Sequence, residues 1–223
     1  MGNTLPMQKL SRIGLRTLIA VALGLALTAG LLVAFRLGSG KTTSSRYERM
    51  DGWQLISGRW TENNGILSNS NYGRGDMLIA QHAQGTNYHI SADIRFDLLF
   101  PETHYGDAGV VIRTTDPAQG VDSYQGYYAG LRPDEQTVVL GRASYDWHQL
   151  ENVKLAAPVS VGSWYHLELS AQGCKLTVTV TPEGNGLPTR IEHQDNQCLK
   201  EGVAGLRSFY AQASWRNVKI EPN

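Results

Sequence analysis

Two aspartates, Asp93 and Asp97, lie four residues apart in the segment DIRFD and would therefore share one face of an extended strand. Glycoside hydrolases use a pair of carboxyl groups at a controlled separation, one as the acid and one as the base or nucleophile. Aspartates at this spacing are also typical of the solvated side of a strand. The pair alone therefore does not predict an enzyme.

Three further aspartates, Asp107, Asp116 and Asp122, lie in the loop-like segments YGDAG and TTDPAQGVDSY. Calcium is bound by several carboxylate and carbonyl oxygens, so these residues are candidate ligands. Aspartates also favour turns, and the spacing is not that of an EF-hand. We therefore expect no obligatory cofactor and keep calcium as the alternative.

The segment DSYQGYYAGL, residues 122–131, concentrates three tyrosines and two glycines. As a strand it would point Tyr127 and Leu131 toward a core, and Tyr124 and Tyr128 toward the opposite face. The glycines would fall on that opposite face and leave open space between the rings. A core-filling role for all three tyrosines remains the alternative.

Aromatic rings beside guanidinium groups are suited to sugar recognition, because rings stack on apolar sugar faces and arginines bond to hydroxyls. Arginines from several predicted strands could join the tyrosines of this face. The candidate ligand-binding residues are Arg113, Tyr124, Tyr128, Arg132, Arg142 and Arg207.

The elements that must position these residues show the period-two alternation of half-buried strands. It is clear in YHISADIRFDLLF (88–100), SWYHLELSA (163–171) and KLTVTVTP (175–182), with turn signals such as ENNG, DPAQG and PEGNG between the strand-like runs. About a dozen short strands without a convincing amphipathic helix predict an all-β fold of two packed antiparallel sheets, or a barrel.

The first 46 residues differ from the rest. Residues 18–35 contain no charge, and with 13–17 they approach the length that spans a bilayer. We expect a basic tail at 1–12, a transmembrane anchor at 13–36, a flexible linker at 37–46 and the β domain at 47–223. A cleaved signal peptide is the alternative to the anchor.

Charge is distributed unevenly along the chain. The formal net charge is zero, but all 20 acidic residues lie from Glu48 onward, and this part of the chain has only 14 basic residues. A mildly acidic domain without a basic stripe is not typical of a nucleic-acid binder. The expected partners are therefore a glycan and, through the N-terminal helix, a membrane.

Cys174 and Cys198 are the only cysteines. In an exported domain they could form a disulfide that closes a loop of about 25 residues. In a reducing compartment they would be two small buried side chains.

The segments DAGVVIRTTDPAQGVDSYQGYYAGLRPDEQTVVLGRASYDWHQL, SWYHLELSAQGCKLTVTV and GVAGLRSFYAQASWRNVKI resemble the concanavalin A-like lectin/glucanase superfamily. In motif order they are similar to the fructan-binding modules of levanases, and to laminin-G-like and 3-keto-disaccharide hydrolase-type domains. The resemblance covers roughly residues 53–220 and implies a jelly-roll sandwich. It also implies Arg113, Tyr124 and Tyr128 as residues of the concave face, where sugars generally bind in this superfamily.

Together these features predict a membrane-anchored carbohydrate-binding domain outside the cytoplasm, in the periplasm or at a bacterial cell surface, without catalytic residues. Two alternatives remain open: a glycoside hydrolase with an atypical carboxylate pair, and a laminin-G-like protein-interaction module. If the domain binds a glycan, we expect Arg113→Ala and Tyr128→Ala to abolish glycan retention and to leave the domain folded.

Overall fold

The computed structural model describes residues 50–184 and 186–223. These residues belong to one compact unit, Tyr47–Asn223. Within the described ranges all regular structure is β-strand, and no helix there is long and apolar enough to cross a membrane. The predicted tail, anchor and linker lie outside the described residues and stay predictions.

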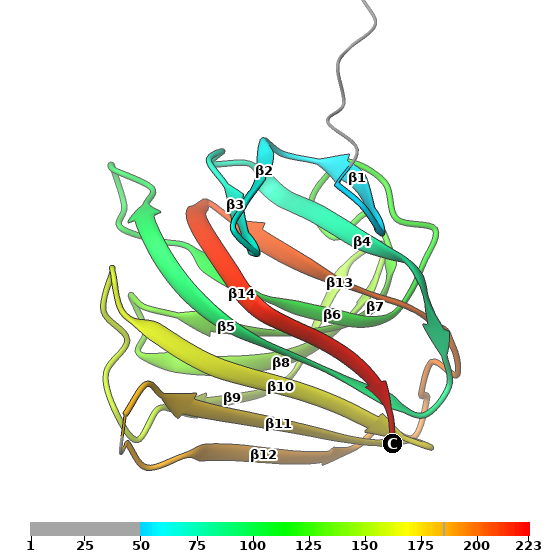
Figure 1. Ribbon diagram of the computed structural model, residues 1–223. Coiled ribbons are helices and arrows are strands. Elements are labelled where there is room, and N and C mark those ends of the chain that lie inside the picture. The colour runs from blue at the N-terminus through cyan, green and yellow to red at the C-terminus, as the bar shows by residue number, and fades with distance from the viewer. Residues whose placement is uncertain (1–49, 185) are drawn as a thin grey trace, which may run out of the picture. The chain divides into compact units, whose positions relative to one another are not determined.

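The strands form two seven-stranded sheets in which every neighbouring pair is antiparallel, and Figure 1 shows them as two layers. The site sheet consists, in spatial order, of β1 (Trp53–Ser57), β4 (Arg74–Gly85), β13 (Gly202–Phe209), β6 (Asp107–Thr115), β7 (Gln125–Arg132), β8 (Thr137–Ser144) and β9 (Trp147–Lys154). The support sheet consists of β12 (Thr189–Gln194), β11 (Lys175–Pro182), β10 (Trp164–Gln172), β5 (Tyr88–Leu99), β14 (Ala211–Pro222), β3 (Ile66–Asn69) and β2 (Trp60–Asn63). The predicted all-β two-sheet sandwich is confirmed for the described residues.

The main core lies between the sheets and follows the alternation of the sequence. Alternate residues of β5, β7 and β10, such as Ile94, Leu131 and Leu167, are fully buried in it. Trp215 of β14 is also fully buried, and its indole N–H donates to the carbonyl oxygen of Gly109 on β6 at 3.1 Å. This bond joins the two sheets directly, because β14 and β6 belong to different layers.

The site sheet also carries a smaller apolar cluster on the face turned away from the main core. This outer cluster consists of Met77, Ile79, Val111, Tyr124, Tyr128, Val139 and Ala143. The loop between β6 and β7, residues 116–124, reaches across this face. The carbonyl oxygen of Gly120 is 2.8 Å from the position that a Cβ on Gly75 of β4 would take. The outer face of the site sheet is therefore partly roofed, and only part of it can accept a ligand.

A disulfide joins Cys174, in the turn between β10 and β11, to Cys198 in the segment after β12. Residues on both sides of it are tied to β6. The guanidinium of Arg113 donates to the carbonyl oxygens of Gly173 and Leu199, at 2.7 and 2.6 Å. The disulfide and this arginine therefore fasten the same edge of the sandwich.

Candidate functional site

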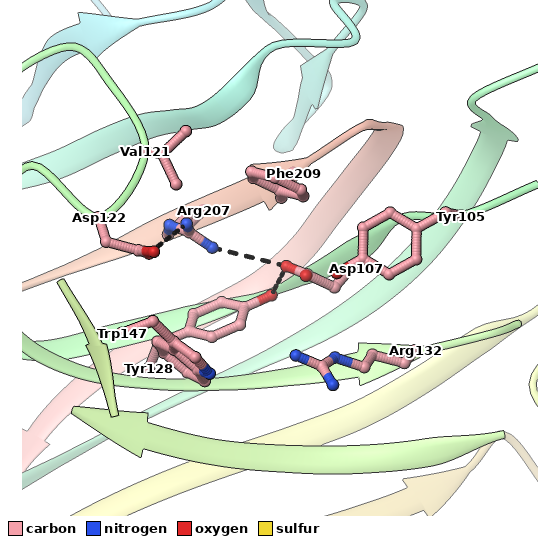
Figure 2. Close-up of a pocket in the computed structure, with 9 residues that line it drawn as sticks. All are labelled: Tyr105, Asp107, Val121, Asp122, Tyr128, Arg132, Trp147, Arg207 and Phe209. Carbon is pink, nitrogen blue, oxygen red and sulfur yellow. Dashed lines mark hydrogen bonds and ion pairs between the residues drawn. The ribbon is translucent and has the colours of Figure 1, made fainter. Parts of the chain in front are cut away.

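The centre of the candidate site is the guanidinium of Arg207, near the end of β13, which lies between two carboxylates (Figure 2). Its Nη2 is 2.9 Å from Oδ1 of Asp122, and its Nη1 is 3.6 Å from Oδ1 of Asp107. The hydroxyl of Tyr128 donates to the same oxygen of Asp107 at 2.5 Å. Three strands and one loop thus meet in a single polar network.

This network is almost completely removed from solvent. Arg207 is 3% exposed, Asp107 4% and Tyr128 1%. Burial raises the pKa of Asp107 above its ordinary value, although Arg207 and the Tyr128 hydroxyl oppose the shift. Burial alone would lower the pKa of Arg207, but the surrounding phenols and carboxylates reverse this, and its pKa is raised. Arg207 therefore stays charged at any physiological pH.

Local structure explains why these side chains meet. Asp107 is the first residue of β6, and its neighbour in register on β13 is Phe209, two residues after Arg207. Asp122 comes from the loop that crosses the face of the sheet, so its carboxylate reaches Arg207 from above the strands. Arginine rather than lysine suits this position, because a planar guanidinium can bond to two carboxylates with separate nitrogens.

A hollow of about 120 Å³ opens over the network. A cavity can hold one water molecule with only about 10–15 Å³ of such space, so this one can take a small ring-shaped group or several waters. Its lining consists of Tyr105, Asp107, Val121, Asp122, Tyr128, Arg132, Trp147, Arg207 and Phe209. We call it the site pocket; its walls are mainly aromatic and its floor is charged.

Two donor atoms of the pocket arginines lack partners. Among residues 50–184 and 186–223, Nε of Arg207 and Nε of Arg132 are buried and make no hydrogen bond. Buried donors without partners cost free energy, and they are uncommon outside sites that bind water or a ligand. Two such donors on arginines of one pocket therefore favour a binding site there.

The structure brings three of the six candidate binding residues into the site pocket: Tyr128, Arg132 and Arg207. Tyr124 lies on the same face, as its position in the strand pattern predicts. Its ring is in the outer cluster, 1% exposed, beside the Arg207 guanidinium at 5.9 Å, and it is not part of the pocket lining.

Arg113 and Arg142 do not reach the pocket. The register of β6 shifts between Ile112 and Thr115, and Arg113 there has a φ of 52°. This irregularity turns Arg113 away from the tyrosine face, toward the carbonyl oxygens near the disulfide. The expectation that Arg113 shares a face with Tyr128 is therefore wrong.

Arg142 points to the opposite side of β8 for a simpler reason. It lies two residues after Leu140, which packs in the main core, so both side chains leave the strand on the core side. Its Nη1 bonds to Asp195 at 2.9 Å. Burial alone would raise the pKa of Asp195, but the Tyr127 hydroxyl, the Gln197 amide and Arg142 lower it below the usual range.

The glycines of the tyrosine strand do not leave open space. A Cβ on Gly130 would lie 2.1 Å from the hydroxyl oxygen of Tyr128, whose ring lies flat along the strand. In the same way, a Cβ on Gly141 of β8 would lie 2.2 Å from Cη2 of Trp147. The expected gap between the rings is therefore wrong, because the glycines allow the rings to lie directly on the sheet.

Sequence reasoning missed four residues of the pocket lining: Tyr105, Val121, Trp147 and Phe209. Trp147 could have been predicted from Gly141 in the segment LGR of the neighbouring strand, because a glycine within a strand often marks a place where another group approaches closely. Tyr105 and Val121 lie in loops, where alternation gives no orientation, and Phe209 is the last residue of its strand.

The three candidate calcium ligands do not form a group. Asp107 and Asp122 both face Arg207, whereas Asp116 accepts a bond from the Tyr145 hydroxyl at 3.4 Å. Within the described part of the chain, no three His, Cys, Asp or Glu residues are placed together to hold a metal ion.

Comparisons with known proteins agree with this architecture. Residues 47–221 match the model of the 3-keto-alpha-glucoside-1,2-lyase-like domain, and the chain belongs to this family. No curated protein sequence matches the chain.

Several solved structures share the fold. The carbohydrate-binding module CBM66 from Bacillus subtilis is similar with a TM-score of 0.63 and 21% identity, over 78% of this chain and 97% of that one. The basic winged bean lectin with Tn-antigen has a TM-score of 0.60 and 10% identity, over 78% and 94%. The exoplasmic/lumenal domain of VIP36, in a Ca²⁺/Man3GlcNAc-bound form, has a TM-score of 0.56 and 12% identity, over 78% and 85%. The described part of the chain thus has the lectin-like jelly-roll fold of these structures.

Proposed function

We propose that this member of the 3-keto-alpha-glucoside-1,2-lyase-like domain family binds a glycan without cleaving it, with one sugar ring seated in the site pocket. The observation that carries the proposal is Arg207, a buried guanidinium fixed by two carboxylates under an aromatic-walled hollow. Its ion pairs and the Tyr128 hydroxyl hold the floor in place before a ligand arrives, which lowers the entropic cost of binding.

The lining provides both kinds of contact that a sugar ring needs. Trp147, Tyr105 and Phe209 offer ring surfaces for the apolar face of a sugar, and Figure 2 shows Trp147 on one side of the floor and the other two rings across from it. Arg132 and Asp122 offer a donor and acceptors for hydroxyl groups at the edges. This mixture of rings and charges supports a glycan over a protein partner, for which a continuous apolar patch would be expected.

The solved relatives support the same reading. One is a carbohydrate-binding module, and two others were solved with a glycan or a glycan antigen. The family description itself points to α-glucosides as the first class of sugar to test.

The test is a glycan array with the full chain, read with and without a chelator. We expect binding to one glycan class, weakened in Trp147→Ala but unchanged in the matched control Trp164→Ala. Trp164 lies on the support sheet, where the guanidinium groups of Arg95 and Arg216 are 4.7 and 4.2 Å from its ring. Loss of one stacking ring should weaken binding about two- to tenfold.

The chelator arm tests calcium separately. Binding that disappears with chelator and returns with added Ca²⁺ would assign the ion a role. Absence of binding to every glycan would reject the proposal.

One observation favours a second candidate function. Asp107 lies in the site pocket with a raised pKa, and such a carboxyl group can act as a general acid. The family description names a lyase acting on 3-keto-α-glucosides. Incubation of the full chain with an α-glucoside and its 3-keto derivative tests this reading. Product formation that is abolished in Asp107→Asn would make the protein an enzyme.

The location proposed for the domain is outside the cytoplasm, tethered by the segment at 13–36. The apolar composition of that segment and the disulfide between Cys174 and Cys198 support it, because disulfides persist mainly in oxidising compartments. Carbonate extraction of membranes, followed by protease treatment of intact cells or spheroplasts, tests both parts. Release by carbonate, or a domain that stays protected from protease in intact spheroplasts, would contradict them.

A further inference from the structure

A chain of five partly buried aromatic rings begins at the wall of the site pocket and leads away from it. We call this chain the aromatic ridge; its residues are Tyr72, Phe100, Tyr105, Phe209 and Tyr210. Tyr105 and Phe209, with ring centroids 5.9 Å apart, also line the pocket. The ridge is therefore continuous with the site already described.

The remaining rings follow at contact distance. The centroid of Tyr210 is 4.6 Å from that of Phe209 and 5.0 Å from that of Phe100. The ring of Tyr72 comes next, 5.9 Å from Phe100. Most of these pairs are edge-to-face, so neighbouring rings present faces in different directions.

The backbone holds the ridge in a fixed arrangement. The amide of Phe100 donates to the carbonyl oxygen of Tyr210 at 3.0 Å, and the amide of Tyr210 donates to that of Gly73 at 2.9 Å. These bonds tie the residue directly before β4 and the residue directly after β5 to the turn between β13 and β14. The rings are thus positioned in advance, as a binding surface requires.

A second hollow, of about 160 Å³, lies beside the ridge, where Asn71, Gly73 and Arg74 of its lining are neighbours of Tyr72 in the sequence. Its lining is polar and consists of Ser57, Asn71, Gly73, Arg74, Gly75, Asp76, Gln119 and Gly120. The exposed Arg74 connects the two features, because its guanidinium lies 5.9 Å from the centroid of the Tyr210 ring while the residue also lines the hollow.

The second hollow is also shaped by fixed polar groups. Oδ2 of Asp76 accepts bonds from the side-chain amides of Asn69 and Asn71, at 2.9 and 3.0 Å, and from the backbone amide of Gly73 at 3.1 Å. The loop that carries Asp122 into the site pocket lines this hollow with Gln119 and Gly120. Both hollows therefore share this loop as a wall.

We propose that the ligand is an oligosaccharide of trisaccharide length or longer, with one sugar in the site pocket, the next along the aromatic ridge and a further one at the second hollow. This inference rests on the proposed glycan-binding function. The occupant is a glycan rather than a lipid surface or a protein because two hollows with polar lining residues border the rings. Aromatic surface followed by hydrogen-bonding groups is the combination that a run of sugar rings needs.

The experiment is isothermal titration calorimetry of the full chain with two series of linear sugars. One runs from glucose to maltohexaose, and the other from fructose to nystose. We expect the Kd of one series to fall about tenfold between the monosaccharide and the trisaccharide, because each added ring contact contributes about two- to tenfold.

Variants separate the ridge from the pocket. Tyr72→Ala and Arg74→Ala should reduce the gain with length, raising the Kd of the trisaccharide more than that of the monosaccharide. Trp147→Ala should raise the Kd of every length by a similar factor, and Trp164→Ala should change none. Arg74 is exposed, so its substitution leaves the fold intact and keeps the test decisive.

The outcomes distinguish the two proposals. The proposed role of the aromatic ridge is overturned if a monosaccharide binds as tightly as its longer homologues and Tyr72→Ala and Arg74→Ala have no effect. The assignment of the site pocket would then still hold. A series in which no member binds overturns both.

Discussion

Replacement of Arg207 by methionine should be one of the most destabilising single substitutions in the domain. The guanidinium lies 2.9 Å from Asp122 and 3.6 Å from Asp107. At an effective dielectric constant of about 20, these separations correspond to gross attractions of about 6 and 5 kcal/mol. Most of that is offset by the cost of taking the charges out of water, so the net worth of the network is far smaller.

Removal of the arginine alone leaves Asp107 buried without its counter-ion. Breaking a buried pair in this way costs about 3–5 kcal/mol. We expect Arg207→Met to lower the free energy of unfolding by about that amount at pH 7, a large fraction of the total stability of a domain. Asp107→Asn in the same chain should restore part of the loss, because the amide still accepts the Tyr128 hydroxyl bond and carries no charge.

The assay is urea unfolding followed by tryptophan fluorescence, for which the chain has five tryptophans. The matched control is Arg132→Met in the same pocket. Arg132 pairs with Glu135 at 3.5 Å, and the Glu135 side chain is 41% exposed, so we expect a loss below about 1 kcal/mol. Equal losses in the two variants would refute the assignment of Arg207 as the buried centre of the network.

The pH dependence gives an independent check of the same reasoning. Burial raises the pKa of Asp107 in the folded state, and removal of Arg207 should raise it further. Between the unfolded pKa, near 4, and this raised value, the folded state binds more protons than the unfolded one, so stability falls as pH rises. The deficit of Arg207→Met relative to the wild type should therefore be smaller at pH 4 than at pH 7. A deficit that is constant with pH would show that Asp107 is not the group left unpaired.

Three further predictions follow from the structure. Arg113→Met should lower the free energy of unfolding by about 3 kcal/mol, because the carbonyl oxygens that accept from its guanidinium would lose their donor. Calorimetry on the folded fraction should give an unchanged Kd for glycans, and a weaker Kd would return Arg113 to the site. Gly130→Ala should push the Tyr128 ring off the strand, and so lower the melting temperature and weaken glycan binding together. A variant that melts and binds as the wild type does would contradict the close approach of ring and backbone. Replacement of Cys174 and Cys198 by serine should lower the free energy of unfolding in urea by about 3 kcal/mol, since the disulfide closes a loop of about 25 residues. An unchanged free energy of unfolding would show that Arg113, beside the disulfide, suffices to hold this edge.

Strand alternation predicts much of the fold and one half of the site. In β7 the parity is regular, so Tyr127 enters the main core and Tyr128 takes the opposite face, as the sequence indicates. It fails in β6, where the register shift after Ile112 turns Arg113 to another direction. A shift of this kind depends on the partner strands, and alternation within one segment carries no sign of it.

The pocket residues that the sequence analysis did not predict were missed for a different reason. Tyr105 and Val121 come from loops, whose course is decided by contacts with distant strands. Asp107 and Asp122 looked like calcium ligands because the sequence does not show that a buried arginine from β13 reaches both of them. Both carboxylates line the site pocket, and their shared partner could not be inferred from their own segments.

The rings that lie flat on the sheet explain why the pocket is small and placed at one end of the strands. Tyr128 over Gly130 and Trp147 over Gly141 lie directly on the strands and, with the outer cluster, leave no gap next to the sheet at these positions. The site pocket lies beside these rings, where Asp107, Arg207 and the surrounding loops meet. Because the floor there is fixed by the ion network, and much of the wall comes from loops outside the sheets, changes in those loops can alter which glycan binds while the core stays as it is. Substitutions in the loop at 116–124 should accordingly change the preference among sugars more than the free energy of unfolding, and those in β13 should do the reverse.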